Sequence, residues 1–245
     1  MKKIYKDSVF TYLYHINAGD VCPKGQLSLK KLMLLFQNIA LDHYTSRAQT
    51  WDELVKKKQA WVLTKIELDL RQTPFLAQDI KLSTWSRGTQ QFKGFREFEV
   101  TCEDKTLITA NTSWIYLDLV KKSPVAFNQS LFPNFTPSTT SNFEGLDNTW
   151  RIKEDFNLQN EIEYKLRYTD YDINNHLNNT VYFELLEDYM MNNQIERPKK
   201  IRAIFKKEVP FHIKALELGM IKNESCYTIV FKSESETHFL AELEF

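Results

Sequence analysis

Three polar residues that could carry out acid–base chemistry alternate within one short segment of the chain. Asp172, Asn174 and His176 stand at every second position, just before a segment with helical periodicity. A carboxylate or an imidazole can act as a base or nucleophile, and an amide can polarise a carbonyl group. The start of a helix also favours an anion or a developing oxyanion, because its first amides are unpaired. Glu208, on a predicted strand, supplies a further carboxylate.

This pattern supports two interpretations. Asp and Asn are common in turns and helix caps, so a loop rich in both before a helix can be purely structural. The interleaved histidine and the additional carboxylate point instead to a catalytic cluster, because groups of ionisable side chains often mark functional sites. The residues alone leave both interpretations open.

A helix followed by strands is predicted for the first half of the chain. Apolar residues recur at helical spacing after Gly25, and Ser28 is the expected N-cap. The residues on this helical face are Leu29, Leu32, Met33, Phe36, Ile39, Ala40 and His43. The period then changes to two over 62–70, and further strand-like stretches cover 80–85, 95–102 and 106–117.

The same order of elements is predicted again after a break. Residues 123–150 contain three prolines among polar residues and have no sustained periodicity, which is typical of a linker. A strand over 161–168 and a helix follow, the helix capped by Asn178 or Asn179 and with Tyr182, Leu185, Leu186, Tyr189 and Met190 on one face. Strands over 200–209, 226–231 and 237–245 complete this half. The repeated order indicates an internal duplication, in which Asp20 to Lys24 would match Asp172 to His176.

Composition excludes several classes of function. The 245 residues are 42% hydrophobic and 26% charged, with 32 basic and 32 acidic side chains, so nucleic-acid binding is not expected. The longest apolar run, 32–36, is far shorter than the ~20 residues that span a bilayer, and no secretory signal is visible. Three widely spaced cysteines favour a reducing, cytoplasmic location. The remaining histidines lack metal-ligand spacing and the glycines are scattered, so neither a metal nor a cofactor is expected.

The segment around the three polar residues resembles a known family, the acyl-acyl carrier protein (acyl-ACP) thioesterases of plastids and bacteria. Asp172-Ile-Asn174-Asn-His176-Leu-Asn178-Asn179-Thr-Val-Tyr182 is similar to the family signature D-x-N-x-H-x-N-N-x-x-Y. The resemblance extends to Leu32-Met33, Ala40-Leu-Asp-His43, Trp61-Val-Leu-Thr-Lys65 and the stretch from Arg96 to Trp114. Glu208, after Phe205-Lys-Lys, falls where the family carries a glutamate.

The resemblance implies an α+β fold of two tandem hot-dog domains, each an antiparallel sheet wrapped around a long helix, together forming an intrachain pseudo-dimer. Residues 1–130 would form the acyl-binding domain, 131–154 the linker and 155–245 the catalytic domain. Met33, Phe36, Ile39 and Trp61 could line a tunnel for the acyl chain, although such apolar residues more commonly form plain core.

The implied function is hydrolysis of fatty acyl-ACP to free fatty acid and acyl carrier protein. Glu208 would act as general base or nucleophile, with Asp172 and His176 orienting it and Asn174 polarising the thioester carbonyl. Some family members carry a cysteine directly after the glutamate, but Val209 occupies that position here, which excludes an obligatory thiol nucleophile there. The alternatives are an acyl-coenzyme A thioesterase and a non-catalytic hot-dog module that binds acyl groups.

The expected partner is acyl carrier protein with its acyl-phosphopantetheine arm. Because this carrier is strongly acidic, basic residues near Glu208 are docking candidates. These are Lys199, Lys200, Arg202, Lys206 and Lys207. Association of two such chains into a homodimer is left open by the sequence.

Overall fold

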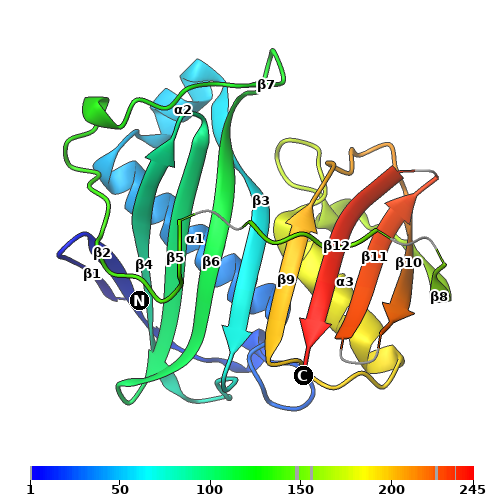
Figure 1. Cartoon of the computed structure of the whole chain (residues 1–245). Coiled ribbons are helices and arrows are strands. Elements are labelled where there is room, and N and C mark those ends of the chain that lie inside the picture. The colour runs from blue at the N-terminus through cyan, green and yellow to red at the C-terminus, as the bar shows by residue number, and fades with distance from the viewer. Residues whose placement is uncertain (1, 147–148, 155–156, 224–225, 235) are drawn as a thin grey trace. The chain divides into compact units, whose positions relative to one another are not determined.

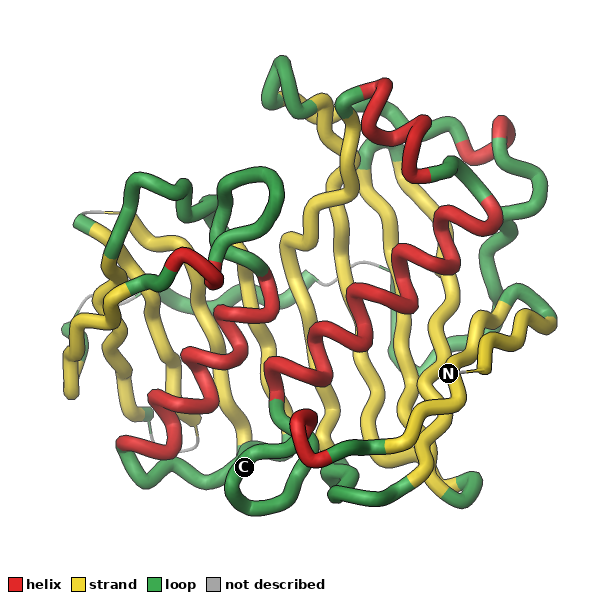
Figure 2. Tube along the Cα trace, turned by 180° about the vertical axis from the view of Figure 1, so that it is seen from behind, coloured by secondary structure: helices red, strands yellow, loops and turns green. Residues whose placement is uncertain are grey.

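The structure, a computed structural model, describes residues 2–146, 149–154, 157–223, 226–234 and 236–245. The chain divides into two compact units. The first comprises Met1–Leu27 and Leu34–Asn148, and the second comprises Ser28–Met33 and Thr149–Phe245. Each unit contains an antiparallel β-sheet with a long helix lying across one face (Figures 1 and 2).

The sheet of the first unit has the strand order β1-β2-β4-β5-β6-β3, with β7 paired to β6. Its strands are β1 (Lys2–Lys6), β2 (Val9–His15), β3 (Gln59–Leu70), β4 (Asp79–Gln90), β5 (Lys93–Cys102), β6 (Lys105–Asp118) and β7 (Ser123–Pro124). The helical elements are η1 (Ala18–Asp20), α1 (Leu29–Arg47, of which the residues from Leu34 onward belong to this unit), α2 (Trp51–Lys57) and η2 (Gln129–Leu131).

Helix α1 forms as its periodicity predicts. Ser28 Oγ accepts a hydrogen bond from the Lys31 amide at 3.2 Å, as expected of an N-cap residue. Phe36 is buried on the apolar face of the helix and stacks on Phe98 of β5, with ring centroids 4.4 Å apart. Helix and sheet therefore share one apolar core in this unit.

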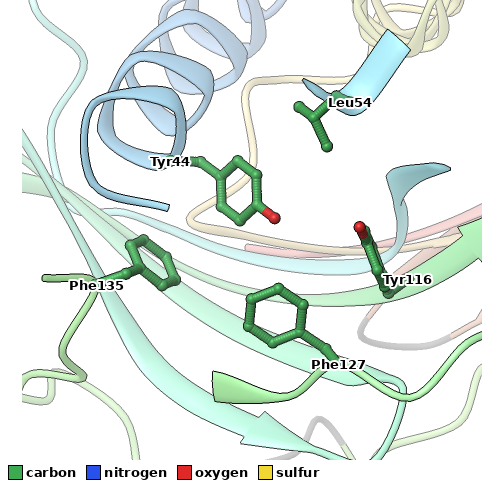
Figure 3. Packing of buried hydrophobic residues seen from close by; sticks show 5 residues of the cluster. All are labelled: Tyr44, Leu54, Tyr116, Phe127 and Phe135. Atoms are coloured by element: carbon green, nitrogen blue, oxygen red, sulfur yellow. The ribbon is translucent and has the colours of Figure 1, made fainter. Parts of the chain in front are cut away.

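An aromatic cluster closes the core near the end of α1. Tyr44, Leu54, Tyr116, Phe127 and Phe135 are its buried members, and Figure 3 shows their side chains converging. Phe127 and Phe135 belong to the segment whose composition predicts a linker. Their aromatic rings pack into the first unit although the backbone around them is irregular, and an irregular segment gives no periodic signal in the sequence.

The sheet of the second unit has the order β9-β12-β11-β10-β8. Its strands are β8 (Gln159–Lys165), β9 (Lys200–Phe205), β10 (Ala215–Lys222), β11 (Cys226–Ser233) and β12 (Glu236–Glu244), and its helices are η3 (Tyr168–Asp170) and α3 (Asn179–Asn192). Asn178 is the N-cap of α3, and its side chain accepts the Thr180 amide at 2.9 Å. From α3, Tyr182 and Phe183 pack against Phe239 of β12.

The opposite face of this sheet is also covered. Val230 and Leu240 are the chain neighbours of residues that pack under α3, so they point to the other side. There they form a buried cluster with Ile152, and Trp150 and Leu158 pack against it. Ile152, which lies in the predicted linker, is thus part of the core of the second unit.

Several elements are absent from the sequence prediction, namely β1, β2, α2, β7 and β10. Gly219 in the middle of β10 weakens the strand pattern, since glycine has a low strand propensity. The structure explains its presence: a Cβ atom at Gly219 would lie 2.9 Å from the Leu158 side chain. None of the helices in the described residues is long and apolar enough to cross a membrane.

Candidate active site

The loop that precedes α3 is anchored by a buried aspartate. Asp170 accepts the Arg167 amide at 2.7 Å and the Arg167 guanidinium at 2.9 Å. Its own carbonyl accepts the Asn178 amide at 2.9 Å, at the far end of the loop. These bonds bring the two ends of the loop together, and Ile173, Asn174 and Asn175 between them are exposed.

Asp172 stabilises this loop through hydrogen bonds to residues within it. Its Oδ1 atom accepts the backbone amides of Asn174 at 2.8 Å and of His176 at 3.2 Å. The Asp172 amide in turn donates to the His176 carbonyl at 2.8 Å. Asp172 therefore orients His176 through its backbone amide rather than through the imidazole ring, and it holds Asn174 both by its backbone amide and by its side-chain amide, which donates to Asp172 Oδ2 at 3.4 Å.

His176 and Glu208 meet across a short backbone pairing. His176 forms an isolated bridge with Pro210, and the Leu177 amide donates to the Val209 carbonyl at 2.9 Å. This pairing places His176 Nε2 3.3 Å from Glu208 Oε2. The side chains are 31% and 46% exposed, so the carboxylate that contacts the imidazole is also open to water or substrate.

Two backbone amides at the start of α3 are already hydrogen-bonded to the N-cap residue Asn178. The Thr180 amide donates to Asn178 Oδ1 and the Val181 amide donates to the Asn178 carbonyl, both at 2.9 Å. These two amides are therefore not free to stabilise an oxyanion. The side-chain amide of Asn174 is exposed and carries two N–H groups, so it can donate to an oxyanion as well as to Asp172.

Tyr182, the last residue of the signature, lies buried below the site. Burial raises the pKa of Tyr182, and the nearby negative charge of Glu208 raises it further. The phenol therefore stays protonated at neutral pH. Its ring packs edge-on against Phe205 with centroids 5.4 Å apart, at the end of the strand that leads to Glu208. From the sequence, Tyr182 is expected only on the apolar helix face and at the last position of the signature, and that position was the signal for its place beside the site.

The equivalent loop of the first unit corrects the predicted alignment of the two halves. The Cys22 amide donates to the Gln26 carbonyl at 2.8 Å, the same bond that Asp172 makes with His176. Matching Asp20 with Asp172 is therefore wrong by two positions, because the capping role of Asp20 is that of Asp170. The correct pairs are Cys22 with Asp172, Lys24 with Asn174 and Gln26 with His176. At these positions the first unit has neither carboxylate nor imidazole.

The predicted acyl-binding residues lie in the cores of the units. Met33, Phe36 and Ile39 are buried, and Trp61 is half-buried against the aromatic cluster of the first unit. By contact, Met33 belongs to the second unit and the other three to the first. Their role in lining a tunnel stays a prediction.

The predicted docking residues carry partly neutralised charges. Arg202 pairs with Glu244 at 2.8 Å, Lys206 pairs with Glu154, and Lys207 pairs with Glu236. Lys199 is exposed and Lys200 is half-buried. Contact with a carrier protein stays a prediction for all five.

The other four histidines differ in exposure, and one of them, His238, contacts the backbone next to Glu208. His15 and His212 are exposed, whereas His43 and His238 are buried. Cys22, Cys102 and Cys226 are unpaired and half-buried. Among the described residues, no group of three or more His, Cys, Asp and Glu side chains could hold a metal ion.

Comparison with solved structures defines the class of fold. Over 97% of this chain, the structure is similar to an acyl-ACP thioesterase from Bacteroides thetaiotaomicron, with a TM-score of 0.80, 21% identity and 98% of that chain covered. The 12:0-ACP thioesterase from Umbellularia californica matches over 98% of both chains, with a TM-score of 0.80 and 16% identity. The chain thus has an α+β fold of two tandem hot-dog domains, as predicted.

Sequence comparison then defines the family. The family model of the acyl-ACP thioesterase N-terminal domain matches residues 7–133, and that of the C-terminal domain matches residues 153–234. The chain therefore belongs to the acyl-ACP thioesterase family. A curated relative, the chloroplastic acyl-[acyl-carrier-protein] hydrolase FATB3 of Cuphea viscosissima, is 24% identical over 194 residues. That match covers 72% of this chain but only 46% of the relative.

Proposed function

We propose that this protein hydrolyses the thioester of fatty acyl-ACP and releases free fatty acid and acyl carrier protein. The observation that carries the proposal is the contact between His176 Nε2 and Glu208 Oε2 at 3.3 Å. His176 lies in the motif that resembles the family signature, Glu208 falls where the family carries a glutamate, and both side chains remain accessible. A loop that only caps a helix would need no such contact with Glu208, which lies beyond the end of β9 at Phe205 rather than on the predicted strand.

In the proposed reaction, Glu208 acts as the general base. Its carboxylate takes a proton from water while the water oxygen bonds to the thioester carbon. The Asn174 side-chain amide donates to the oxyanion that develops on the carbonyl oxygen. The carbon–sulfur bond then breaks, and the proton held by Glu208 passes to the thiolate of the carrier. His176 holds the Glu208 carboxylate in place during both steps.

A carboxylate mechanism agrees with the residue that follows Glu208. Val209 is fully buried, and its carbonyl is engaged by Leu177. The cysteine of the second unit, Cys226, lies at the start of β11, whereas Glu208 follows β9. The three unpaired cysteines also suit a reducing compartment such as the cytoplasm, which we include in the proposal.

The carrier is part of the same proposal. Acyl carrier protein would bring the acyl group on its phosphopantetheine arm, and Lys199, Lys200, Arg202, Lys206 and Lys207 remain the proposed docking residues. Lys206 and Lys207 directly precede Glu208, so a carrier bound there would deliver its thioester beside the base.

A thiol-release assay tests the proposal. The protein would be given matched acyl-ACP and acyl-coenzyme A substrates over a range of chain lengths. We expect thiol release from both carriers to be measurable and faster from acyl-ACP. Faster release from acyl-coenzyme A would assign the protein to the alternative carrier. Acyl binding without any thiol release would instead show a binding module.

A further inference from the structure

A buried serine–histidine pair lies beside the segment that carries Glu208. Ser233 Oγ and His238 Nε2 are 2.6 Å apart across the turn between β11 and β12. His238 Nδ1 lies 3.2 Å from the carbonyl oxygen of Lys207, the residue before Glu208. The two side chains are almost completely buried, at 8% and 1% exposure.

The partners of His238 fix the state of its ring. Burial lowers the pKa of His238, so the imidazole is neutral and carries one N–H group. A backbone carbonyl can only accept a hydrogen bond, so Nδ1 must carry the proton. Nε2 is then an acceptor, and the Ser233 hydroxyl donates to it. The Lys207 carbonyl thus selects the tautomer, and the Ser233 hydroxyl, which can donate or accept, stabilises it by donating to Nε2.

The backbone of His238 makes a further hydrogen bond to the segment that precedes Glu208. Its carbonyl accepts the Lys206 amide at 2.8 Å. On the other side of Glu208, the Val209 carbonyl accepts the Leu177 amide from the loop of His176. Glu208 therefore sits between two anchored peptides, one held by His238 and the other by the catalytic loop.

We propose that His238, fixed by Ser233, is a positioning residue that sets the backbone of Glu208 for catalysis. A second serine-based active site is not supported, because both side chains are buried and the far nitrogen of the imidazole faces a carbonyl rather than a carboxylate. The inference rests on the proposed function, since it assigns His238 to the base of that reaction. Loss of the Nδ1 donor would let the Lys207 peptide shift, and a shift of about 1 Å in a reacting group can cost roughly 100-fold in rate.

Two amide substitutions at His238 test the Nδ1 hydrogen-bond donor, because both remove the imidazole ring but only one keeps an N–H group near the place of Nδ1. In His238→Asn the side-chain NH₂ group lies near the place of Nδ1 and can still donate to Lys207. In His238→Gln the longer side chain carries its NH₂ group closer to the place of Nε2. We expect His238→Gln to lower kcat on acyl-ACP at least ~10-fold with KM nearly unchanged, and His238→Asn to keep kcat within ~3-fold, because the rate follows the position of the base. Ser233→Ala, which removes the hydrogen bond to Nε2 but keeps the Nδ1 donor, should fall between them.

Glu208→Gln and thermal melting of every variant serve as controls. If His238→Gln or Ser233→Ala is folded and keeps the parental kcat while Glu208→Gln is inactive, the positioning role is wrong and the proposed function stands. If Glu208→Gln is itself as active as the parent protein, the proposed site fails. Equal losses of kcat in the Asn and Gln variants, in proportion to their loss of melting temperature, would show that His238 is only structural.

Discussion

At the residue scale, the two carboxylates of the site have different tasks. Glu208 has an accessible carboxylate in contact with His176, whereas Asp172 directs one oxygen at two backbone amides. The first arrangement suits a base that must reach water. The arrangement of Asp172 suits a residue that stabilises the loop conformation, because a charged acceptor strengthens amide hydrogen bonds.

Two substitutions of Asp172 should distinguish its role as a hydrogen-bond acceptor for the loop amides from the effect of its negative charge. Asp172→Ala removes the acceptor for both amides, so the loop loosens and kcat should fall by up to ~100-fold. Asp172→Asn keeps one oxygen acceptor and should retain clearly more activity than the alanine variant. Steady-state hydrolysis of acyl-ACP by the two variants measures the difference. Parental activity of Asp172→Ala would show that these hydrogen bonds are not needed.

The cysteines should be dispensable for hydrolysis. Replacing Cys22, Cys102 and Cys226 by serine should leave kcat within ~3-fold of the parental value, because no thiol is placed to act as nucleophile. Small losses of melting temperature are expected, since all three side chains are half-buried. Inactivation of a folded variant by any one of these changes would instead establish a thiol mechanism.

At the element scale, the loop before α3 depends on one unusual backbone conformation. Asn175 has a φ angle of +59°, and Gly25 has +73° at the matching place in the first unit. This left-handed region is accessible to glycine and asparagine but strained for β-branched residues. The loop conformation is thus shared by both units, while the chemistry is confined to one.

Asn175 therefore offers a matched pair of variants. Asn175→Gly should retain activity and stability, because Gly25 shows that glycine suits this loop. Asn175→Val should cost roughly 1–2 kcal/mol of stability and lower kcat, because valine resists the left-handed conformation. Chemical denaturation and acyl-ACP hydrolysis would be measured on both. Equal behaviour of the two variants would contradict a role for this backbone conformation.

The elements also show how far the sequence could predict the site. Strong helical periodicity and caps identified α1 and α3, and the motif identified the residue types of the site. The contact between His176 and Glu208 depends on a backbone pairing between segments distant in sequence, which periodicity cannot reveal. His238 was missed for a related reason: a single histidine on a strand has no spacing pattern, and only burial and its two partners give it meaning.

At the scale of the whole molecule, buried ionisable groups link stability to pH. His43 is fully buried in the first unit, where its Nδ1 atom lies 3.1 Å from the Arg96 guanidinium. Burial, and then the charges of Arg96 and Arg47, lower the pKa of His43 to about 2. Burial also lowers the pKa of Arg96, to about 10, so the guanidinium remains charged at neutral pH.

The free energy of unfolding should consequently fall as the pH drops below the pKa of an ordinary histidine. Folded His43 stays neutral, while the unfolded chain binds a proton below its ordinary pKa of 6.5, so protons favour unfolding. The expected contribution of His43 is roughly 1.4 kcal/mol per pH unit below pH 6. Urea unfolding at several pH values would show a shallower dependence in His43→Gln. The same dependence in both proteins would contradict this assignment.

The overall fold was predictable to a greater extent than its boundaries. The repeated order of helix and strands predicted two helix-and-sheet halves, and each unit has that layout. The segment 131–154 was predicted as a linker from its prolines and polar residues, yet Phe135 and Ile152 within it are buried. Irregular chain that packs by a few large side chains leaves no periodic trace in the sequence.

The most direct test of the account is the rate of thiol release from acyl-ACP by the Glu208→Gln variant. The substitution preserves volume and removes only the charge, so the melting temperature and acyl binding should stay near the parental values. Because a general base typically contributes at least ~100-fold to the rate, we expect kcat to fall by that factor or more. Hydrolysis at a near-parental rate, or a loss of activity that only follows unfolding, would contradict the assignment of Glu208 as the base.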